Sequence, residues 1–119
     1  MMSAMATTTA TDVQLAAKLF RGFGDPLRLA ILVALADGER RVTDLVSQLR
    51  GSQGNISGHL ACLKDCGLVI DRAEGRQVFY RIAGPEVVRV LRAAEALLAS
   101  TGHRIDLCSN YRTPRQLSS

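Results

Sequence analysis

Two cysteines stand four residues apart in the stretch HLACLKDCG, at Cys62 and Cys66, and a third, Cys108, lies near the C-terminus. Residues at i and i+4 share one face of a helix, so the two thiolates can converge on a single ion with little distortion. Free cysteines also pack well as small apolar residues, and a pair of thiols can act in redox chemistry. Two thiols at ligand spacing, with a third in the tail, favour a metal site over both alternatives.

Three thiolates form a soft site of low coordination number. Such a site suits Cd²⁺, Pb²⁺ or As(III) better than magnesium or calcium. Zn²⁺ prefers four ligands and would need His59, His103 or a water molecule to complete the set. Because Cys108 is distant along the chain, the tail must fold back onto its own chain or, in a dimer, reach the partner. We expect Cys62, Cys66 and Cys108 to be the ligands.

Two other uses of these thiols are less favoured. A disulfide between Cys62 and Cys66 would be poorly placed within one helical turn, although a redox sensor remains an alternative. His59 and Cys62 are a conceivable base and nucleophile, but no third orienting group is implied. We therefore expect that the chain is not an enzyme.

The composition of the 119-residue chain is that of a small basic domain. Its formal net charge of +4 and its pI near 9.4 suit a polyanionic partner. No apolar run approaches the roughly 20 residues that span a bilayer, and the start MMSAMATTTAT lacks the features of a signal peptide. A cytoplasmic, reducing location is expected, in which cysteines remain thiols.

The first part of the chain predicts a tail followed by two helices. Residues 1–11 are small and polar and are expected to be disordered, and the first helix should begin near Asp12. In GDPLRLAILVALADG, Asp25 is the expected N-cap, Pro26 the first helical residue and Gly38 the stop. The expected buried stripe of this helix is Leu27, Ala30, Ile31, Ala34 and Leu35.

The remaining elements complete a winged helix-turn-helix, a mainly α fold with a small β-hairpin (α+β). VTDLVSQLRG predicts a short helix capped by Thr43, and a turn then leads into a helix over 53–66. The segments LVIDRA and RQVFYRI alternate with period two and predict the hairpin. A last helix begins at Pro85 and ends at Gly102. The domain is thus expected over 12–102, with a tail over 103–119 that carries Cys108. The apolar first and last helices should pair in a homodimer.

The helix over 53–66 has one apolar face and one polar or small face. Ile56, Leu60 and Leu63 fall together and should face the core. The opposite face, which includes Gly54, Gly58 and Ala61, has the character of a helix that enters the major groove of double-stranded DNA. A merely solvated face, or a fold that only mediates protein contacts, is the alternative. The expected DNA-binding residues are Arg50, Ser52, Gln53, Ser57, Lys64, Arg72 and Arg76.

Three segments, DPLRLAILVAL, NISGHLACLKDCGLV and EGRQVFYRI, resemble the signature segments of ArsR-family metal-sensing repressors, over about residues 15–98. The resemblance implies a homodimer that binds a palindromic operator when metal-free and is released when its inducer binds. The family's usual Ser-Xaa-Ser-His-His run is altered here, because Gly54 and Gly58 stand where side chains often project. This departure bears on which operator sequence is read, not on the mode of binding.

Within that family the thiols resemble the CmtR-type sensors of cadmium and lead. Those sensors carry the pattern HLxCLxxCG on the recognition helix, matched by Cys62 and Cys66, and a third cysteine in the tail, matched by Cys108. In this family His59 is more often structural than a ligand. Two other sites of the family are absent, because RRVTDL lacks Cys-Xaa-Cys and PEVVRVLRAAEALLAS lacks histidine. An arsenite sensor that uses the same thiols is the nearest alternative.

Overall fold

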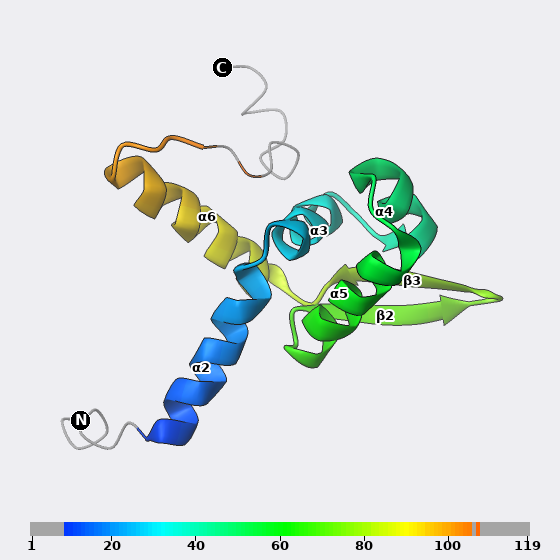
Figure 1. Cartoon of the computed structure of the whole chain (residues 1–119), viewed down its shortest axis with the longest axis horizontal. Coiled ribbons are helices and arrows are strands. Elements are labelled where there is room, and N and C mark those ends of the chain that lie inside the picture. Colours follow the sequence, from blue (N-terminus) through cyan, green and yellow to red (C-terminus); the bar gives the residue numbers. More distant parts are fainter. Residues whose placement is uncertain (1–8, 106, 108–119) are drawn as a thin grey trace.

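A computed structural model describes residues 9–105 and 107 as a winged helix-turn-helix (Figure 1). This α+β fold confirms the predicted class, and each predicted helix and both strands of the hairpin are present. The helices are α2 (Ala10–Phe23), α3 (Pro26–Ala36), α4 (Val42–Leu49), α5 (Gln53–Asp65) and α6 (Pro85–Ser100). The strands are β1 (Arg40–Arg41), β2 (Val69–Glu74) and β3 (Gln77–Ile82).

Helices α2 and α3 begin at side-chain caps. Helix α2 starts at Ala10, two residues before the predicted Asp12, because Thr9 and Asp12 form a reciprocal capping box. The residues before Thr9 lie outside the described part of the chain. Helix α3 starts as predicted: the Asp25 carboxylate accepts the backbone N–H groups of Leu27 and Arg28 at 3.0 Å each.

The start of α4 differs from the prediction, which placed its cap at Thr43. The N-cap residue is Arg41, whose backbone N–H donates to the Asp44 carboxylate at 2.9 Å. Arg40 and Arg41 also form the short strand β1, antiparallel to β3, which sequence analysis did not predict. Two charged residues have no alternating pattern, so nothing in this dipeptide indicated pairing with a strand far along the chain.

The hairpin has the expected two-strand form and adds β1 at one edge, in the order β1-β3-β2. Glu74 pairs with Gln77, so Gly75 and Arg76 make a two-residue turn, and Gly75 has the positive φ of 64° that such turns require. One face of the hairpin packs on the core through Val69, with Tyr80 and Ile82 half-buried beside it.

The core lies where α3, α4, α5 and the hairpin meet. Most of the predicted stripe of α3 is confirmed, but Leu27 and Ala30 are only half-buried while Leu32 is fully buried. Helix α3 packs against α2, α4, α5 and β3, so it buries more than one face. The fully buried large side chains include Ile31, Leu32, Leu45, Ile56, Leu60, Leu63 and Leu91.

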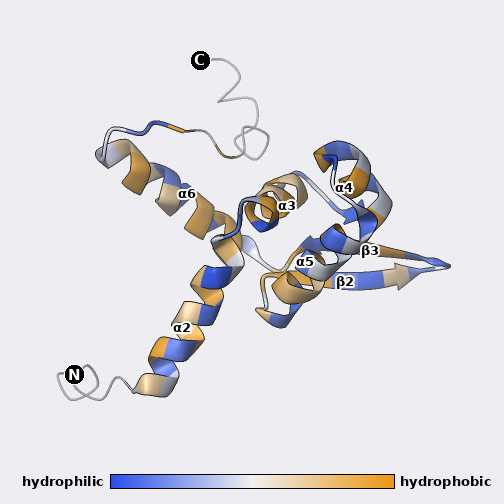
Figure 2. Cartoon of the chain, viewed as in Figure 1, coloured by the Kyte–Doolittle hydropathy of each residue, from blue (hydrophilic) through white to orange (hydrophobic). Residues whose placement is uncertain are grey.

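The first and last helices project away from this core, and apolar residues occur along both of them (Figure 2). Several of their large apolar side chains are exposed. On α2, Leu15 is 68% exposed and Phe20 65%, and on α6 Leu97 is 67% exposed. Single exposed apolar residues are ordinary, but several large ones on two projecting helices form a surface that favours burial. None of the described helices is long and apolar enough to cross a membrane.

We predict that Leu45→Ala destabilises the domain by about 2–5 kcal/mol. Leu45 is fully buried on α4, so its truncation leaves a cavity that surrounding side chains fill only in part. The measurement is urea unfolding followed by circular dichroism. Ser47→Ala, an exposed change on the same helix, should stay within about 0.5 kcal/mol of the parent. Equal effects of the two changes would contradict this account of the core.

Candidate functional site

Helix α5 has one buried face and one open face, as predicted. Ile56, Leu60 and Leu63 are each 0% exposed and fix the rotation of the helix against the core. Gln53, Gly54, Gly58, Ala61 and Lys64 are exposed on the outer side, and Ser57 is half-buried.

The two glycines make this outer face unusually flat. A Cβ atom built at Gly54 or at Gly58 would meet no other atom within 4 Å, so neither glycine is required by packing inside the chain. Glycine in the interior of a helix costs about 0.5–1 kcal/mol relative to alanine. The absence of an internal reason for Gly58 is consistent with close approach of another molecule to the helix backbone.

Two of the expected DNA-binding residues, Ser52 and Arg50, directly precede α5. Ser52 is the N-cap, and its Oγ accepts the Asn55 backbone N–H at 3.1 Å. Arg50 is exposed at the C-cap of α4, in a left-handed conformation with φ 59°. Arg50 precedes the Ser52 N-cap of α5 by two residues, and the N-terminal end of a helix favours an anion.

Lys64 lies on the outer side of α5 but is already engaged. Its ammonium Nζ is 2.9 Å from the Asp71 carboxylate of β2. This hydrogen bond raises the pKa of Lys64. Lys64 thus joins α5 to the hairpin, and its charge is partly balanced within the chain.

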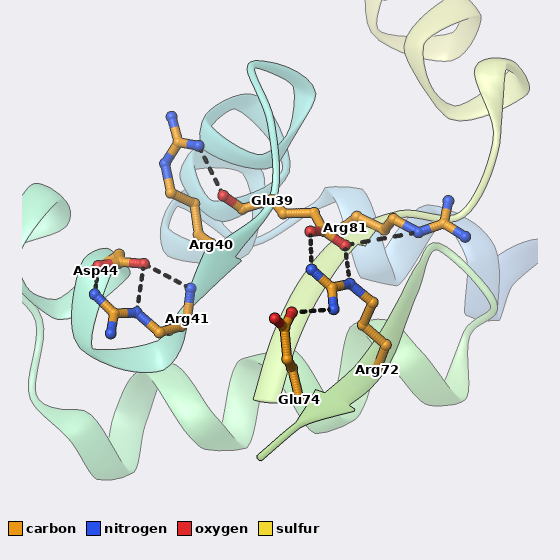
Figure 3. A network of polar contacts seen from close by, with 7 residues as sticks. All are labelled: Glu39, Arg40, Arg41, Asp44, Arg72, Glu74 and Arg81. Carbon is orange, nitrogen blue, oxygen red and sulfur yellow. Dashed lines mark hydrogen bonds and ion pairs between the residues drawn. The ribbon is translucent and has the colours of Figure 1, made fainter. Parts of the chain in front are cut away.

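The two hairpin arginines differ in environment. Arg76 is exposed at the tip of the hairpin, between β2 and β3. Arg72 instead donates to the carboxylates of Glu39 and Glu74 (Figure 3). The sequence predicted that both arginines contact DNA. In the structure Arg76 is exposed at the hairpin tip, whereas Arg72 is paired with carboxylates of its own chain.

Cys62 and Cys66 lie on the flank of α5, and both are half-buried free thiols. Cys66 points to α2, where its Sγ donates to the Lys18 backbone carbonyl at 3.6 Å. Burial raises the pKa of the Cys66 thiol, and the neighbouring Cys62 raises it further. Cys62 and Cys66 are therefore close enough to interact, as expected for residues at i and i+4 of a helix.

Cys66 also lies between two cavities. One, of about 420 Å³, is lined by Leu15 and Leu19 of α2 together with Cys66. The other, of about 290 Å³, is lined by Cys66 together with Val87 and Val90 of α6. The end of α5 therefore lies next to both projecting helices, α2 and α6.

The third predicted ligand, Cys108, lies outside the described residues. Within residues 9–105 and 107, no three cysteine, histidine, aspartate or glutamate side chains are grouped so as to hold a metal ion. The residue before Cys108 is held in place: the buried Glu95 carboxylate of α6 accepts the Leu107 backbone N–H at 2.8 Å. The sequence did not lead us to predict a role for Glu95. The only feature that could have indicated one is its spacing, since Glu95 lies on the same face of α6 as the buried Val87 and Leu91.

His59 has a structural environment. Its Nδ1 lies 3.3 Å from the Arg28 guanidinium, and its Nε2 lies 3.7 Å from the Asp25 carboxylate. Both ring nitrogens thus face partners at the start of α3. This arrangement supports the interpretation of His59 as a residue that joins α3 to α5, not as a metal ligand. His103 is exposed after α6, near Thr101.

Comparisons with known proteins agree with this architecture. Residues 25–71 match the bacterial regulatory protein, arsR family. The chain is 34% identical over 106 residues to a probable mercury resistance operon repressor of Streptomyces lividans, covering 89% of this chain and 85% of that protein. It is 45% identical over 75 residues to the HTH-type transcriptional regulator CmtR of Mycobacterium bovis, covering 63% of this chain and 64% of that relative.

A solved structure shares the fold as well. It is the homodimeric winged helix-turn-helix DNA-binding domain of a possible ArsR-family transcriptional regulator from Mycobacterium bovis. It is 32% identical to this chain, with a TM-score of 0.71, covering 76% of this chain and 83% of that one. With a helix-turn-helix, a hairpin wing and relatives that match along most of its length, the chain belongs to the ArsR family of bacterial transcriptional regulators.

Proposed function

We propose that this chain is a transcriptional repressor that reads operator DNA with the outer face of α5. The observation that carries the proposal is the open, glycine-lined and polar surface of that helix, which no part of the described chain covers. In this proposal Gln53 and Ser57 hydrogen-bond base edges in the major groove. Arg50, which precedes α5 by three residues in the chain, and Arg76 at the hairpin tip contact phosphates.

The proposal includes a homodimer, which the surface of the projecting helices supports. Leu15 and Phe20 of α2 and Leu97 of α6 are large, apolar and exposed in the single chain. A second copy packed on them would remove this area from water, and the dimer would then carry two copies of α5. Two such helices in a dimer match DNA half-sites about 34 Å apart. The homodimeric domain among the similar structures supports this arrangement.

The inducer in this proposal is a soft metal ion, Cd²⁺ or Pb²⁺, held by Cys62, Cys66 and Cys108. Two of these thiols are half-buried neighbours four residues apart on α5, and Cys66 also lines an open cavity, which suits a soft ligand at an accessible place. The bond from Leu107 to Glu95 keeps the chain before Cys108 on α6, whose first turns share a cavity with Cys66. As(III) and Zn²⁺ are alternatives for the same thiols.

The thiol of Cys66 suggests how the signal reaches DNA. As a neutral thiol it donates its proton to the Lys18 carbonyl and so ties the end of α5 to α2. Metal ligation requires the thiolate, which has no proton to donate and is repelled by a carbonyl oxygen. Loss of this bond frees α5 to shift against α2. A typical allosteric coupling of about 1–3 kcal/mol would weaken operator binding roughly 5–150-fold.

The redox alternative uses the same two thiols. Burial raises the pKa of Cys66 and so disfavours the thiolate that oxidation and metal binding both require. The metal is favoured because a disulfide within one helical turn has poor geometry.

We predict that Gly58→Ala raises fold stability and weakens DNA binding at the same time. Alanine should stabilise α5 by about 0.5–1 kcal/mol, because its methyl group meets no atom of the chain. The methyl should weaken binding about 10-fold, within the range of one mismatched base pair. The measurements are thermal unfolding and fluorescence anisotropy with a duplex that the protein selects from a random library. If Gly58→Ala made the protein more stable but left its affinity for DNA unchanged, the DNA would not approach α5 at Gly58.

We predict that reduced protein titrated with Cd²⁺ develops an ultraviolet thiolate-to-metal band that saturates at one ion per chain. Cys62→Ser and Cys108→Ser should each weaken the band, because each removes one of three sulfur ligands. The same titration in the presence of the selected duplex should release the DNA. If Cys108→Ser still released DNA with full cadmium sensitivity, the tail would have no part in sensing.

We predict that His59→Ala lowers the free energy of unfolding by about 1 kcal/mol and leaves the cadmium band unchanged. The change removes the contacts to Arg28 and Asp25 but no metal ligand. His103→Ala, at an exposed position, is the matched control and should alter neither property. A cadmium band that weakened in the His59 variant would make this histidine a ligand.

A further inference from the structure

The carboxylate of Glu39, in the segment between α3 and α4, forms ion pairs with the hairpin. Glu39 directly precedes β1, and its two carboxylate oxygens accept from two nitrogens of Arg72 on β2, Nε at 2.9 Å and Nη2 at 2.8 Å (Figure 3). Such a forked pair fixes direction as well as distance, which a single hydrogen bond does not. Arg81 of β3 adds a longer contact, with its Nε 4.0 Å from Glu39.

The other contacts of Arg72 complete its surroundings. Its Nη1 donates to the Glu74 carboxylate at 2.6 Å. The guanidinium lies over the Phe79 ring, 4.8 Å from the centroid, at the distance of a cation–π contact. The positive charge of Arg72 is therefore shared between two carboxylates and an aromatic face, and little of it is left for a phosphate.

The strand register places Arg72 on the side of the hairpin that faces away from α5. Successive side chains of a strand point to opposite faces. Asp71, the residue before Arg72, bonds to Lys64 of α5. Arg72 and its cross-strand partner Phe79 therefore lie on the other face of the sheet.

The backbone alone joins the hairpin only loosely to the helix-turn-helix on this side. Strand β1 has two residues and pairs with β3 only at Arg40 and Arg41. The Glu39–Arg72 fork reaches farther, past β3 to the outer strand β2. It links two points 33 residues apart in the chain, one at the entry to α4 and the other near the hairpin tip.

From this geometry we propose that Glu39 is a positioning residue for DNA binding. It touches no DNA, and it holds Arg72, and with it the hairpin, at the angle at which Arg76 meets the DNA backbone. The inference rests on the proposed function, since it concerns how the wing of a DNA-binding protein is aimed. It also moves Arg72 from the DNA-contacting residues to those that orient the wing.

The test is Glu39→Gln, which keeps the shape of the side chain and removes its charge. We expect affinity for the selected duplex to fall about fivefold, and hairpin amides to exchange faster with deuterium in the DNA-free protein. The matched control is Asp37→Asn. It removes the same charge two residues away, where the carboxylate pairs with Arg40 and does not reach the hairpin. The control should bind as tightly as the parent or slightly more tightly, because it also gains net positive charge.

Salt dependence separates positioning from direct contact. Arg76→Ala should reduce the slope of log affinity against log salt by about 1, as the loss of one phosphate contact does. Glu39→Gln and Arg72→Ala should each lower the affinity for DNA but leave the slope of log affinity against log salt the same as in the parent protein. Their double variant should bind no worse than either single one, because both break the same fork.

Three outcomes would overturn the inference. Tighter binding by Glu39→Gln than by Asp37→Asn, with a steeper salt slope, would make Arg72 a phosphate contact that Glu39 restrains. Unchanged affinity and hairpin exchange, in a parent protein that binds DNA, would make the fork an ordinary surface pair and leave the proposed function intact. Failure of the parent protein to select or bind any duplex would remove the proposed function, and the inference with it.

Discussion

The burial of one face of α5 is the constraint on which the rest of the structure depends. Ile56, Leu60 and Leu63 are completely buried, at spacings of four and three residues that set the rotation of the helix. Because a helix side chain cannot move to another face without turning the whole element, this burial decides what every other residue of α5 faces. It turns the glycine-lined side outward and brings Cys66 to α2.

One rigid helix therefore carries both the proposed reading surface and two of the proposed sensing thiols. Cys66 sits where α5 meets α2 and the first turns of α6, the two helices with exposed apolar side chains. In the proposal, metal binding at the thiols acts where α5 contacts α2 and α6, the two helices that would form the dimer. In this proposal, coupling between the thiols and DNA needs no long pathway, because α5 carries both the proposed metal ligands and the proposed DNA-contacting face.

The hairpin is held from both faces by ion pairs. Lys64 and Asp71 join it to α5 on one side, and Arg72 and Glu39 join it to the entry of α4 on the other. Exposed ion pairs contribute little to global stability. Two pairs on opposite faces of the hairpin nevertheless fix its angle relative to the helices. Basic residues of this domain thus have two roles: some orient the wing, while Arg50 and Arg76 remain exposed beside the open face of α5.

The sequence by itself determined the order and type of the main elements, because their signals are local. The cap at Asp25, the apolar period of α5 and the period-two alternation of the hairpin strands each act within a few residues, and each prediction is confirmed. Tertiary structure alone decided that strand β1 forms and that Leu32 is buried. It also decided the hydrogen bond between Leu107 and Glu95 and the ion pair between Arg72 and Glu39. These depend on which segments meet in space, and a charged residue carries no local mark that distinguishes a free side chain from one whose partner lies 33 residues away.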